Sequence, residues 1–86
     1  MTKFEHLEFQ PFGGGNVAKI HFPNGYGASV VCHNRSYGGN RGLYELAVLK
    51  GEEICYDTPI TNDVMGWLYP HDVEGLLVRI EQLPSE

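Results

Sequence analysis

The residues best suited to chemistry lie in the segment "HNRSYGGNRG", residues 33–42, which holds two arginines, one tyrosine and three glycines. Glycine lets backbone N–H groups converge on an anion, a guanidinium can fork onto a phosphate, and a phenol ring can stack on a base. The segment lacks the Lys-Ser/Thr ending of a phosphate loop, and the residues after it are typical of a strand rather than a helix. Either it recognises a partner or ligand, or it is a connector whose glycines adopt positive φ.

The side chains that could hold a metal ion are Cys32, His33, Cys55 and the other three histidines. They form no C-x-x-C or H-x-x-x-H pair, the spacings typical of zinc sites. Cys32 and His33 are consecutive, so they point to opposite faces if they lie in a strand. Buried or half-buried thiols are therefore the preferred interpretation, and neither a metal nor a cofactor is expected.

Two pairs of side chains resemble catalytic pairs. His71 and Asp72 begin an expected helix, where adjacent side chains diverge by about 100°, so roles that complement the helix dipole are favoured. Asp57 and Asp63 flank "TPITN" and could form a carboxylate pair or a divalent-cation site, although capping of turns is favoured. Because no nucleophile is paired with a base, the sequence predicts a protein that is not an enzyme.

Composition bounds the fold and the partners. The 86 residues are 42% hydrophobic and indicate one domain, residues 1–86. The net charge of −5, with six scattered basic residues, argues against non-specific binding to nucleic acid or anionic lipid. The opening "MTKFEHLEF" lacks the apolar run of a signal peptide, and no stretch approaches the ~18 apolar residues of a membrane span. A cytoplasmic location with reduced cysteines is expected.

A hairpin is the first element that must position these groups. Residues 17–22 and 26–33 alternate in polarity around Pro23–Gly25, which is typical of a three-residue hairpin with a left-handed glycine. The register that follows pairs Phe22 with Tyr26 and predicts one core face. The other face is expected to be largely wet and carries Lys19, His21, Ser29 and His33.

Further elements follow along the chain. Strands are expected at 4–9, at 42–50, which is apolar on both faces and therefore central, and at 53–57. Residues 10–16 are expected to be a breaker and 58–63 to be irregular, with Asp63 capping a short turn through "VMGWL". The class is α+β: a small antiparallel sheet of four to five strands with one main C-terminal helix, residues 70–83, packed on one face. The main core is predicted to contain Ile20, Phe22, Val30, Trp67, Val73, Leu76, Leu77 and Ile80.

The hairpin register also brings the two glycine-rich segments together. It places Gly15 opposite His33, so "QPFGGGN" and "HNRSYGGNRG" lie at one end of the sheet. That end is expected to be mobile and to have a composition suited to gripping a partner. The candidate partner-binding residues are Phe12, Arg35, Tyr37 and Arg41.

The string "FPNGYGASVV…SYGGNRGLYELAVLKGEEICYDTPITNDVMGWL", residues 22–68, resembles small uncharacterised proteins of tailed bacteriophages and prophages. The resemblance implies a host bacterial cytoplasm and an accessory protein that binds and modulates a host protein, such as a defence or nucleic-acid-processing factor. The alternative is a module that binds a small ligand or nucleic acid through the glycine-rich loop 34–42. The partner's identity and the oligomeric state, a homodimer included, stay open.

Overall fold

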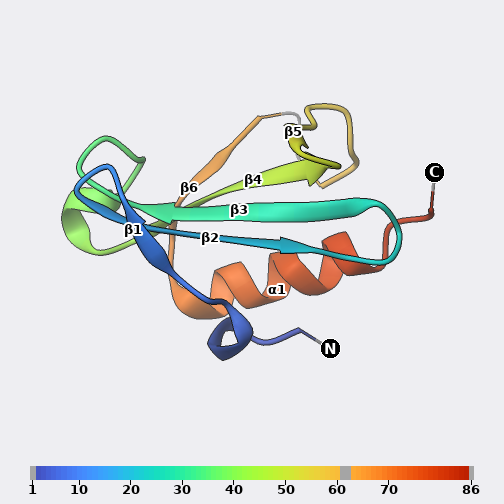
Figure 1. The fold of residues 1–86 in the computed structure, drawn as a ribbon, viewed down its shortest axis with the longest axis horizontal. Coiled ribbons are helices and arrows are strands. Elements are labelled where there is room, and N and C mark those ends of the chain that lie inside the picture. Colours follow the sequence, from blue (N-terminus) through green and yellow to red (C-terminus); the bar gives the residue numbers. More distant parts are fainter. Residues whose placement is uncertain (1, 61–62, 86) are drawn as a thin grey trace.

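A computed structural model describes residues 2–60 and 63–85. Within this part of the chain, a sheet of six strands is covered on one face by a single C-terminal helix (Figure 1). The expected α+β class is confirmed. In chain order the elements are the 3₁₀ helix η1 (Phe4–His6), β1 (Gln10–Phe12), β2 (Gly15–His21), β3 (Tyr26–Cys32), the 3₁₀ helix η2 (Gly39–Arg41), β4 (Tyr44–Lys50), β5 (Glu53–Ile54), β6 (Met65–Leu68) and α1 (Pro70–Glu81).

The strands pair in the order β1-β2-β3-β4, and every pairing is antiparallel. β5 and β6 both pair with β4, β5 near its end and β6 near its start. β4 is therefore central, as its apolar pattern predicts. No helix in residues 2–60 and 63–85 combines the length and the apolar character needed to cross a bilayer.

The β2–β3 hairpin has the predicted register, with Ala18 opposite Val30 and Ile20 opposite Ala28. The Phe22 N–H donates to the Tyr26 carbonyl at 2.8 Å, which closes the three-residue turn. Gly25 has a φ of +91°, the left-handed conformation that this turn requires. The turn residues and the alternation of polar and apolar residues therefore specify the same register.

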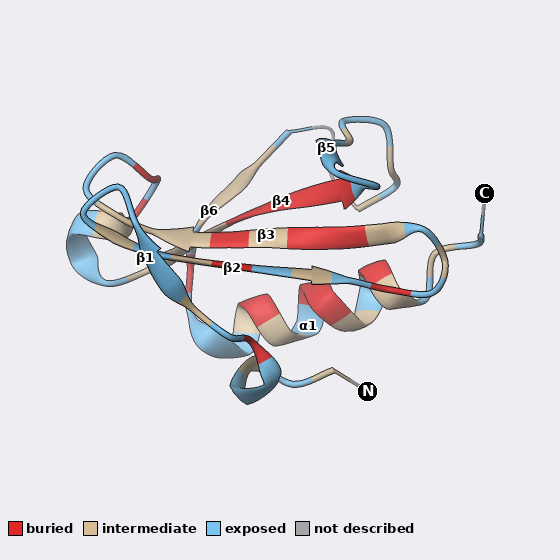
Figure 2. Cartoon of the chain, in the orientation of Figure 1, coloured by how far each residue is buried: buried red, intermediate tan, exposed pale blue. Residues whose placement is uncertain are grey.

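The core lies between α1 and the inner face of the sheet (Figure 2). The helix contributes the predicted stripe, in which Val73, Leu77 and Ile80 are fully buried. Two predicted core positions differ. Ile20 is only half-buried at the margin of the core, and Trp67 is 59% exposed. Leu68 is the residue of β6 that enters the core, so the adjacent Trp67 side chain points out of it.

The prediction of a strand at residues 4–9 is wrong. The chain forms η1 there, and the Phe4 N–H donates to the Glu74 carboxylate of α1 at 2.7 Å. The rings of Phe4 and Phe9 pack on Tyr44, with centroids 5.2 and 5.6 Å from it. These aromatic contacts hold the segment beside the core, and the first strand, β1, forms in the segment expected to be a breaker.

Two further segments differ from prediction. The strand expected at 53–57 is shorter than predicted: β5 ends at Ile54, one further in-register bond joins the Cys55 N–H to the Val48 carbonyl at 2.7 Å, and Cys55 then packs against the core. The turn expected through "VMGWL" is instead β6. Asp63 accepts a hydrogen bond from the Val64 N–H at 2.7 Å just before this strand. Part of the segment expected to be irregular, residues 61–62, lies outside the described residues.

The sheet face opposite α1 is less wet than predicted. It carries the expected polar side chains Lys19 and His21, but also Val17 and Val31, which pair across β2 and β3. On β4, Ala47 and Leu49 belong to this face and are only 8% and 3% exposed. The sheet thus has a second, smaller apolar surface.

Candidate functional site

The two glycine-rich segments meet at one end of the sheet, as predicted (Figure 1). Gly15 lies so close to the opposite strand that a Cβ there would stand 2.7 Å from the His33 Cα, nearer than real side chains approach. The β1–β2 turn reaches the β3–β4 loop, where a Cβ on Gly14 would contact the Asn34 side chain at 3.5 Å. The loops are therefore packed against each other rather than merely adjacent.

The β3–β4 loop is organised around Ser36, its one buried polar residue. The Ser36 hydroxyl accepts from the His33 N–H at 2.9 Å and donates to the His33 carbonyl at 3.0 Å. The Tyr37 N–H donates to the Glu45 carboxylate at 2.7 Å. Backbone groups of the loop are thus bonded within the fold, which leaves its larger side chains to face solvent.

Phe12 and Arg35, two of the predicted residues, line one hollow of about 580 Å³ together with Gly13, His33 and Asn34. The Phe12 and His33 rings meet edge to face with centroids 5.6 Å apart. His33 Nδ1 accepts a hydrogen bond from the Arg35 N–H at 3.0 Å, so the neutral imidazole carries its proton on Nε2. The hollow therefore combines a cation, an N–H donor and an aromatic wall.

Tyr37 and Arg41 stand at the same end but do not line this hollow. The Tyr37 side chain is 61% exposed, and Arg41 is an exposed residue of η2. In the described part of the chain, neither the Arg35 nor the Arg41 guanidinium makes a hydrogen bond or ion pair. The four predicted residues therefore lie at the same end of the sheet, two of them around the hollow and two outside it.

Trp67 lies at the same end, beside Tyr37, and was missed by sequence reasoning, which placed it in the core. Its N–H donates to the Tyr37 carbonyl at 3.1 Å, and its side chain is 59% exposed. Its φ of +59° is uncommon for any residue with a side chain and is an outlier for a bulky one. Gly38 packs against it so closely that a Cβ there would lie 3.0 Å from the Trp67 Cα.

Charge distinguishes this end from the rest of the molecule. Residues 9–18 contain no charged side chain, and residues 29–45 contain only Arg35, Arg41 and Glu45 when histidine is neutral. These segments carry a formal +1 in a chain of −5. Where β4 begins, burial and, to a smaller extent, the nearby Cys32 raise the pKa of Tyr44, so its phenol stays neutral at physiological pH.

The two pairs that resemble catalytic pairs are placed as follows. His71 Nε2 lies 3.4 Å from Asp72 Oδ1, so the prediction that these side chains diverge is wrong. The other Asp72 oxygen accepts from the Tyr69 N–H at 3.0 Å, and the His71 ring stacks on Tyr69. The position of Asp72 in the first turn of α1 and its bond to the Tyr69 N–H agree with the predicted role of complementing the helix dipole. Because the exposed His71 ring stacks on Tyr69, it lies over the start of α1, where it meets the Asp72 carboxylate.

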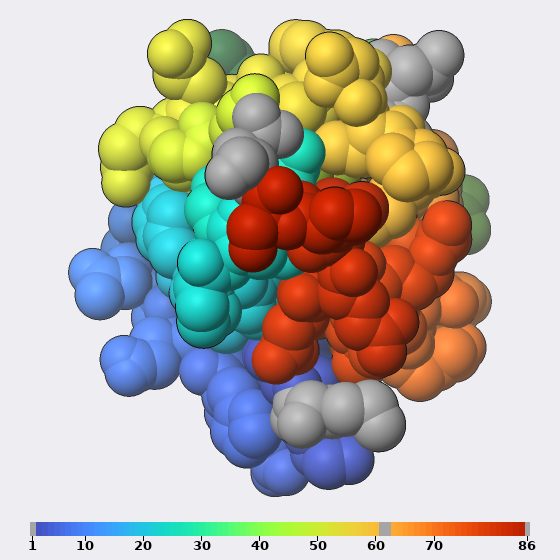
Figure 3. Space-filling view, turned by 90° about the vertical axis from the view of Figure 1, so that its right-hand side faces the viewer, coloured from blue at the N-terminus to red at the C-terminus, as the bar shows by residue number. Residues whose placement is uncertain are grey.

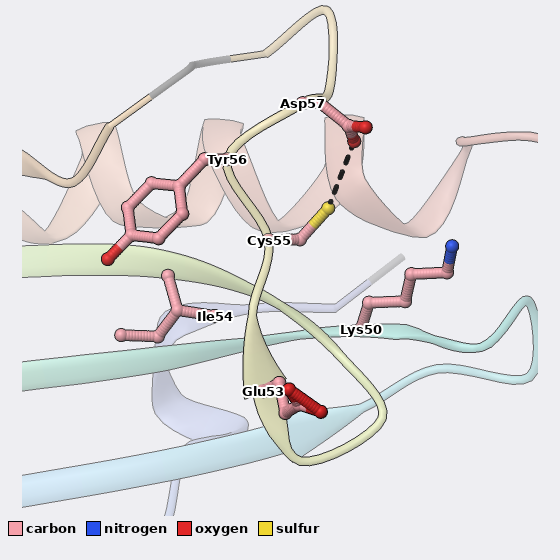
Figure 4. Close-up of a pocket in the computed structure, with 6 residues that line it drawn as sticks. All are labelled: Lys50, Glu53, Ile54, Cys55, Tyr56 and Asp57. Carbon is pink, nitrogen blue, oxygen red and sulfur yellow. Dashed lines mark hydrogen bonds between the residues drawn. The ribbon is translucent and has the colours of Figure 1, made fainter.

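Asp57 lines a different hollow, of about 390 Å³, beside β5 (Figure 4). Its carboxylate turns toward Cys55, whose thiol donates to Asp57 Oδ1 at 3.4 Å. Asp63 accepts from the backbone of Val64, a turn role. Over residues 2–60 and 63–85, no three histidine, cysteine, aspartate or glutamate side chains gather as a metal site.

Comparisons of the chain with models of protein families, with curated proteins and with solved structures gave no significant match. The resemblance of residues 22–68 to phage proteins stays a prediction.

Proposed function

We propose that this chain is a non-enzymatic accessory protein that binds another protein through its recognition end. The recognition end consists of Phe12, Arg35, Tyr37, Arg41 and Trp67. The observation that carries the proposal is the gathering of three aromatic side chains, each more than half exposed, with two arginines on one end of a small sheet. Tyrosine, tryptophan and arginine are the residue types that dominate binding energy at protein interfaces.

The backbone of Trp67 supports the same proposal. A left-handed conformation at a residue with a side chain costs of the order of 1–3 kcal/mol and persists only where the surroundings impose it. Here the surroundings are the Tyr37 carbonyl and Gly38, and the result is an indole that faces solvent rather than the core. A strained backbone that exposes a large aromatic ring is typical of a binding surface.

Charge indicates the kind of partner. The two arginines of the recognition end and the Glu45 carboxylate bonded to the Tyr37 N–H carry a formal +1 while the whole chain carries −5, so an acidic protein surface is repelled less here than elsewhere. The same overall charge disfavours long stretches of nucleic acid, whose affinity comes from many phosphate contacts. With the resemblance of residues 22–68, this makes the proposed partner an acidic surface on a host protein in the bacterial cytoplasm.

A second candidate function has one observation in its favour, the hollow beside Phe12. Arg35 and the Nε2–H of His33 are suited to an anionic group, and the Phe12 ring offers a stacking wall. A nucleotide or a short single strand of nucleic acid would contact Arg35, His33 and Phe12 together. This function predicts that nucleotides raise the melting temperature, and the absence of any shift across a nucleotide panel would rule it out.

The deciding experiment is affinity capture from bacterial lysate with the full chain and two matched variants. Arg35→Ala/Tyr37→Ala/Arg41→Ala removes the loop contacts, and Tyr56→Ala/Arg79→Ala removes an exposed tyrosine and arginine elsewhere. We expect the wild type and the second variant to retain the same protein, and the first variant to lose it. Recovery of no specific protein, together with tight retention of a small metabolite, would contradict the proposal.

A further inference from the structure

The turn between β2 and β3 contains the one Asn-Gly sequence of the chain, Asn24–Gly25. Asparagine is a thermolabile residue, and it cyclises most readily before glycine, which has no side chain to hinder its own backbone nitrogen. The other asparagines precede valine, arginine or aspartate. Gly25 is exposed, and a Cβ built on it would meet no atom within 4 Å. Burial therefore does not shield the reactive peptide group from water.

The reaction open to this sequence consumes only water. The Gly25 backbone nitrogen attacks Cγ of Asn24, the bond from Cγ to Nδ2 breaks, and the Gly25 N–H proton leaves with Nδ2 as ammonia. Water then opens the cyclic imide at either of its two carbonyls, which gives aspartate or isoaspartate. Both products replace the Nδ2 donor with a carboxylate, and isoaspartate also inserts Cβ into the main chain.

Hydrogen bonds to the end of α1 oppose this reaction in the folded protein (Figure 1). Asn24 Nδ2 donates to the carbonyls of Ile80, Leu83 and Glu81 at 2.9 to 3.2 Å. Asn24 Oδ1 accepts from the Tyr26 N–H at 3.0 Å. Attack turns Cγ from planar to tetrahedral, which moves both atoms out of these bonds. Nδ2 must also gain a proton to leave, and carbonyl oxygens cannot supply one.

The attacking nitrogen is held as well. The Gly25 N–H, whose proton must be lost, donates to the Phe22 carbonyl at 3.1 Å. The Gly25 carbonyl accepts from the Gly51 N–H, also at 3.1 Å, so the glycine is fixed on both sides. Reaction therefore requires the hairpin turn and the end of α1 to separate first.

We propose that Asn24 is a site of spontaneous deamidation that the docked end of α1 holds in check. This inference goes beyond the proposed function and does not depend on it. Once the amide has become a carboxylate, it cannot donate to the three carbonyl oxygens and is repelled by them, so the contact does not re-form. The lifetime of the folded protein then depends on how rarely this contact opens.

Peptide mapping of the full chain by mass spectrometry tests the proposal. Samples are kept at mildly alkaline pH in buffer or in guanidinium chloride, and trypsin then releases residues 20–35, which contain both Asn24 and Asn34. In guanidinium chloride we expect Asn24 to be modified well before Asn34, which precedes arginine. In buffer, modification of Asn24 should be at least about tenfold slower. Equal rates at Asn24 in the two solvents, or an unmodified Asn24 in guanidinium chloride, would overturn the proposal.

Two core variants locate the opening that permits the reaction. Leu83 and Met65 are both half-buried and pack against the core, Leu83 just after α1 and Met65 on β6. Leu83→Ala loosens the helix end and should speed modification of Asn24 several-fold in buffer, with no change in guanidinium chloride. Met65→Ala should speed it less. Equal acceleration by the two variants would place the opening in global unfolding and contradict control by the helix end.

Asn24→Asp carries the aspartate product without the reaction and tests its consequence. We expect its urea midpoint to fall below that of the wild type, because the donor to the helix carbonyls is lost. An unchanged midpoint would show that the modified turn docks normally, and it would overturn the inferred limit on lifetime.

Discussion

The two ends of the sheet use polar side chains in opposite ways. At the hairpin end, Asn24 Nδ2 donates to the carbonyls of Ile80, Leu83 and Glu81 at 2.9, 3.0 and 3.2 Å, and its Oδ1 accepts from the Tyr26 N–H at 3.0 Å. Figure 3 views this end, where the hairpin turn lies directly beside the last residues of α1. At the recognition end, the short side chain of Ser36 and the Glu45 carboxylate bond to loop backbone, but the guanidinium groups of Arg35 and Arg41 face solvent.

Residues that stabilise the fold and residues proposed to bind a partner therefore lie at opposite ends of one sheet. The Asn24 side chain is engaged within the fold, so it has little left to offer a partner. The side chains of Arg35, Tyr37 and Arg41 are exposed, so their loss should cost the fold little. Substitutions can therefore distinguish the two ends. We expect the loss in the free energy of unfolding to be largest in the shared core, smaller at the hairpin end and smallest at the recognition end.

The largest effect is expected in the core beneath both ends. Leu77 is fully buried, so Leu77→Ala removes apolar contacts and leaves a cavity, at a cost of about 2–5 kcal/mol in the free energy of unfolding. Urea denaturation measures this loss. A value below about half a kcal/mol would contradict the packing of α1 on the sheet.

The next largest effect should come from the hairpin end. Asn24→Ala removes the donor to three carbonyls and the acceptor within the turn, and we expect it to cost about 2 kcal/mol. Asn40→Ala is the matched control, because Asn40 is an exposed asparagine of η2 at the other end. Its urea midpoint should stay close to that of the wild type. Equal losses in the free energy of unfolding for the two variants would contradict the proposed difference between the hairpin end and the recognition end.

A smaller effect is expected where Gly38 meets Trp67. Gly38 and Gly42 both have positive φ, at +87° and +75°, but a Cβ on Gly38 would press on the Trp67 backbone and one on Gly42 would meet open space. Gly42→Ala should therefore cost about 1 kcal/mol and Gly38→Ala roughly twice that. Trp67 is the single tryptophan, so fluorescence reports its displacement. An unchanged emission spectrum in Gly38→Ala would contradict the contact.

The smallest effect on stability is expected from Arg35→Ala/Tyr37→Ala/Arg41→Ala. We expect the free energy of unfolding to stay within about 0.5 kcal/mol of the wild type, because all three side chains are exposed. Affinity for the captured partner should fall by about 2 kcal/mol or more, roughly thirtyfold. Calorimetry and a binding titration on the same samples measure both. Unaltered affinity would show that the β3–β4 loop is only a connector between the two strands.

The hairpin and the helix could be predicted because their determinants are local. Pro23–Gly25 defines a turn type, which sets the register of both flanking strands, and the helical stripe is visible within residues 70–83. The same register correctly placed the two glycine-rich segments at one end. The sequence alone therefore groups Phe12 with Arg35.

The remaining errors arise from long-range contacts. The side to which Trp67 points depends on how β6 pairs with β4, and that pairing contains a register shift between Tyr44 and Leu46. A register shift reverses which residues face the core, and no local pattern shows it. Phe4 is similar, because it leaves the expected strand to pack on Tyr44, some forty residues away in sequence.

Asn24 also has a consequence for the order in which the molecule assembles. Its side chain joins the hairpin turn to carbonyls 56 to 59 residues further along the chain. These bonds can form only after the turn and the last turn of α1 both exist and have docked. They therefore belong to a late folding step, and losing them should speed unfolding more than it slows folding. For the same reason, amide protons at the helix end and in the hairpin turn should exchange with solvent through one shared opening.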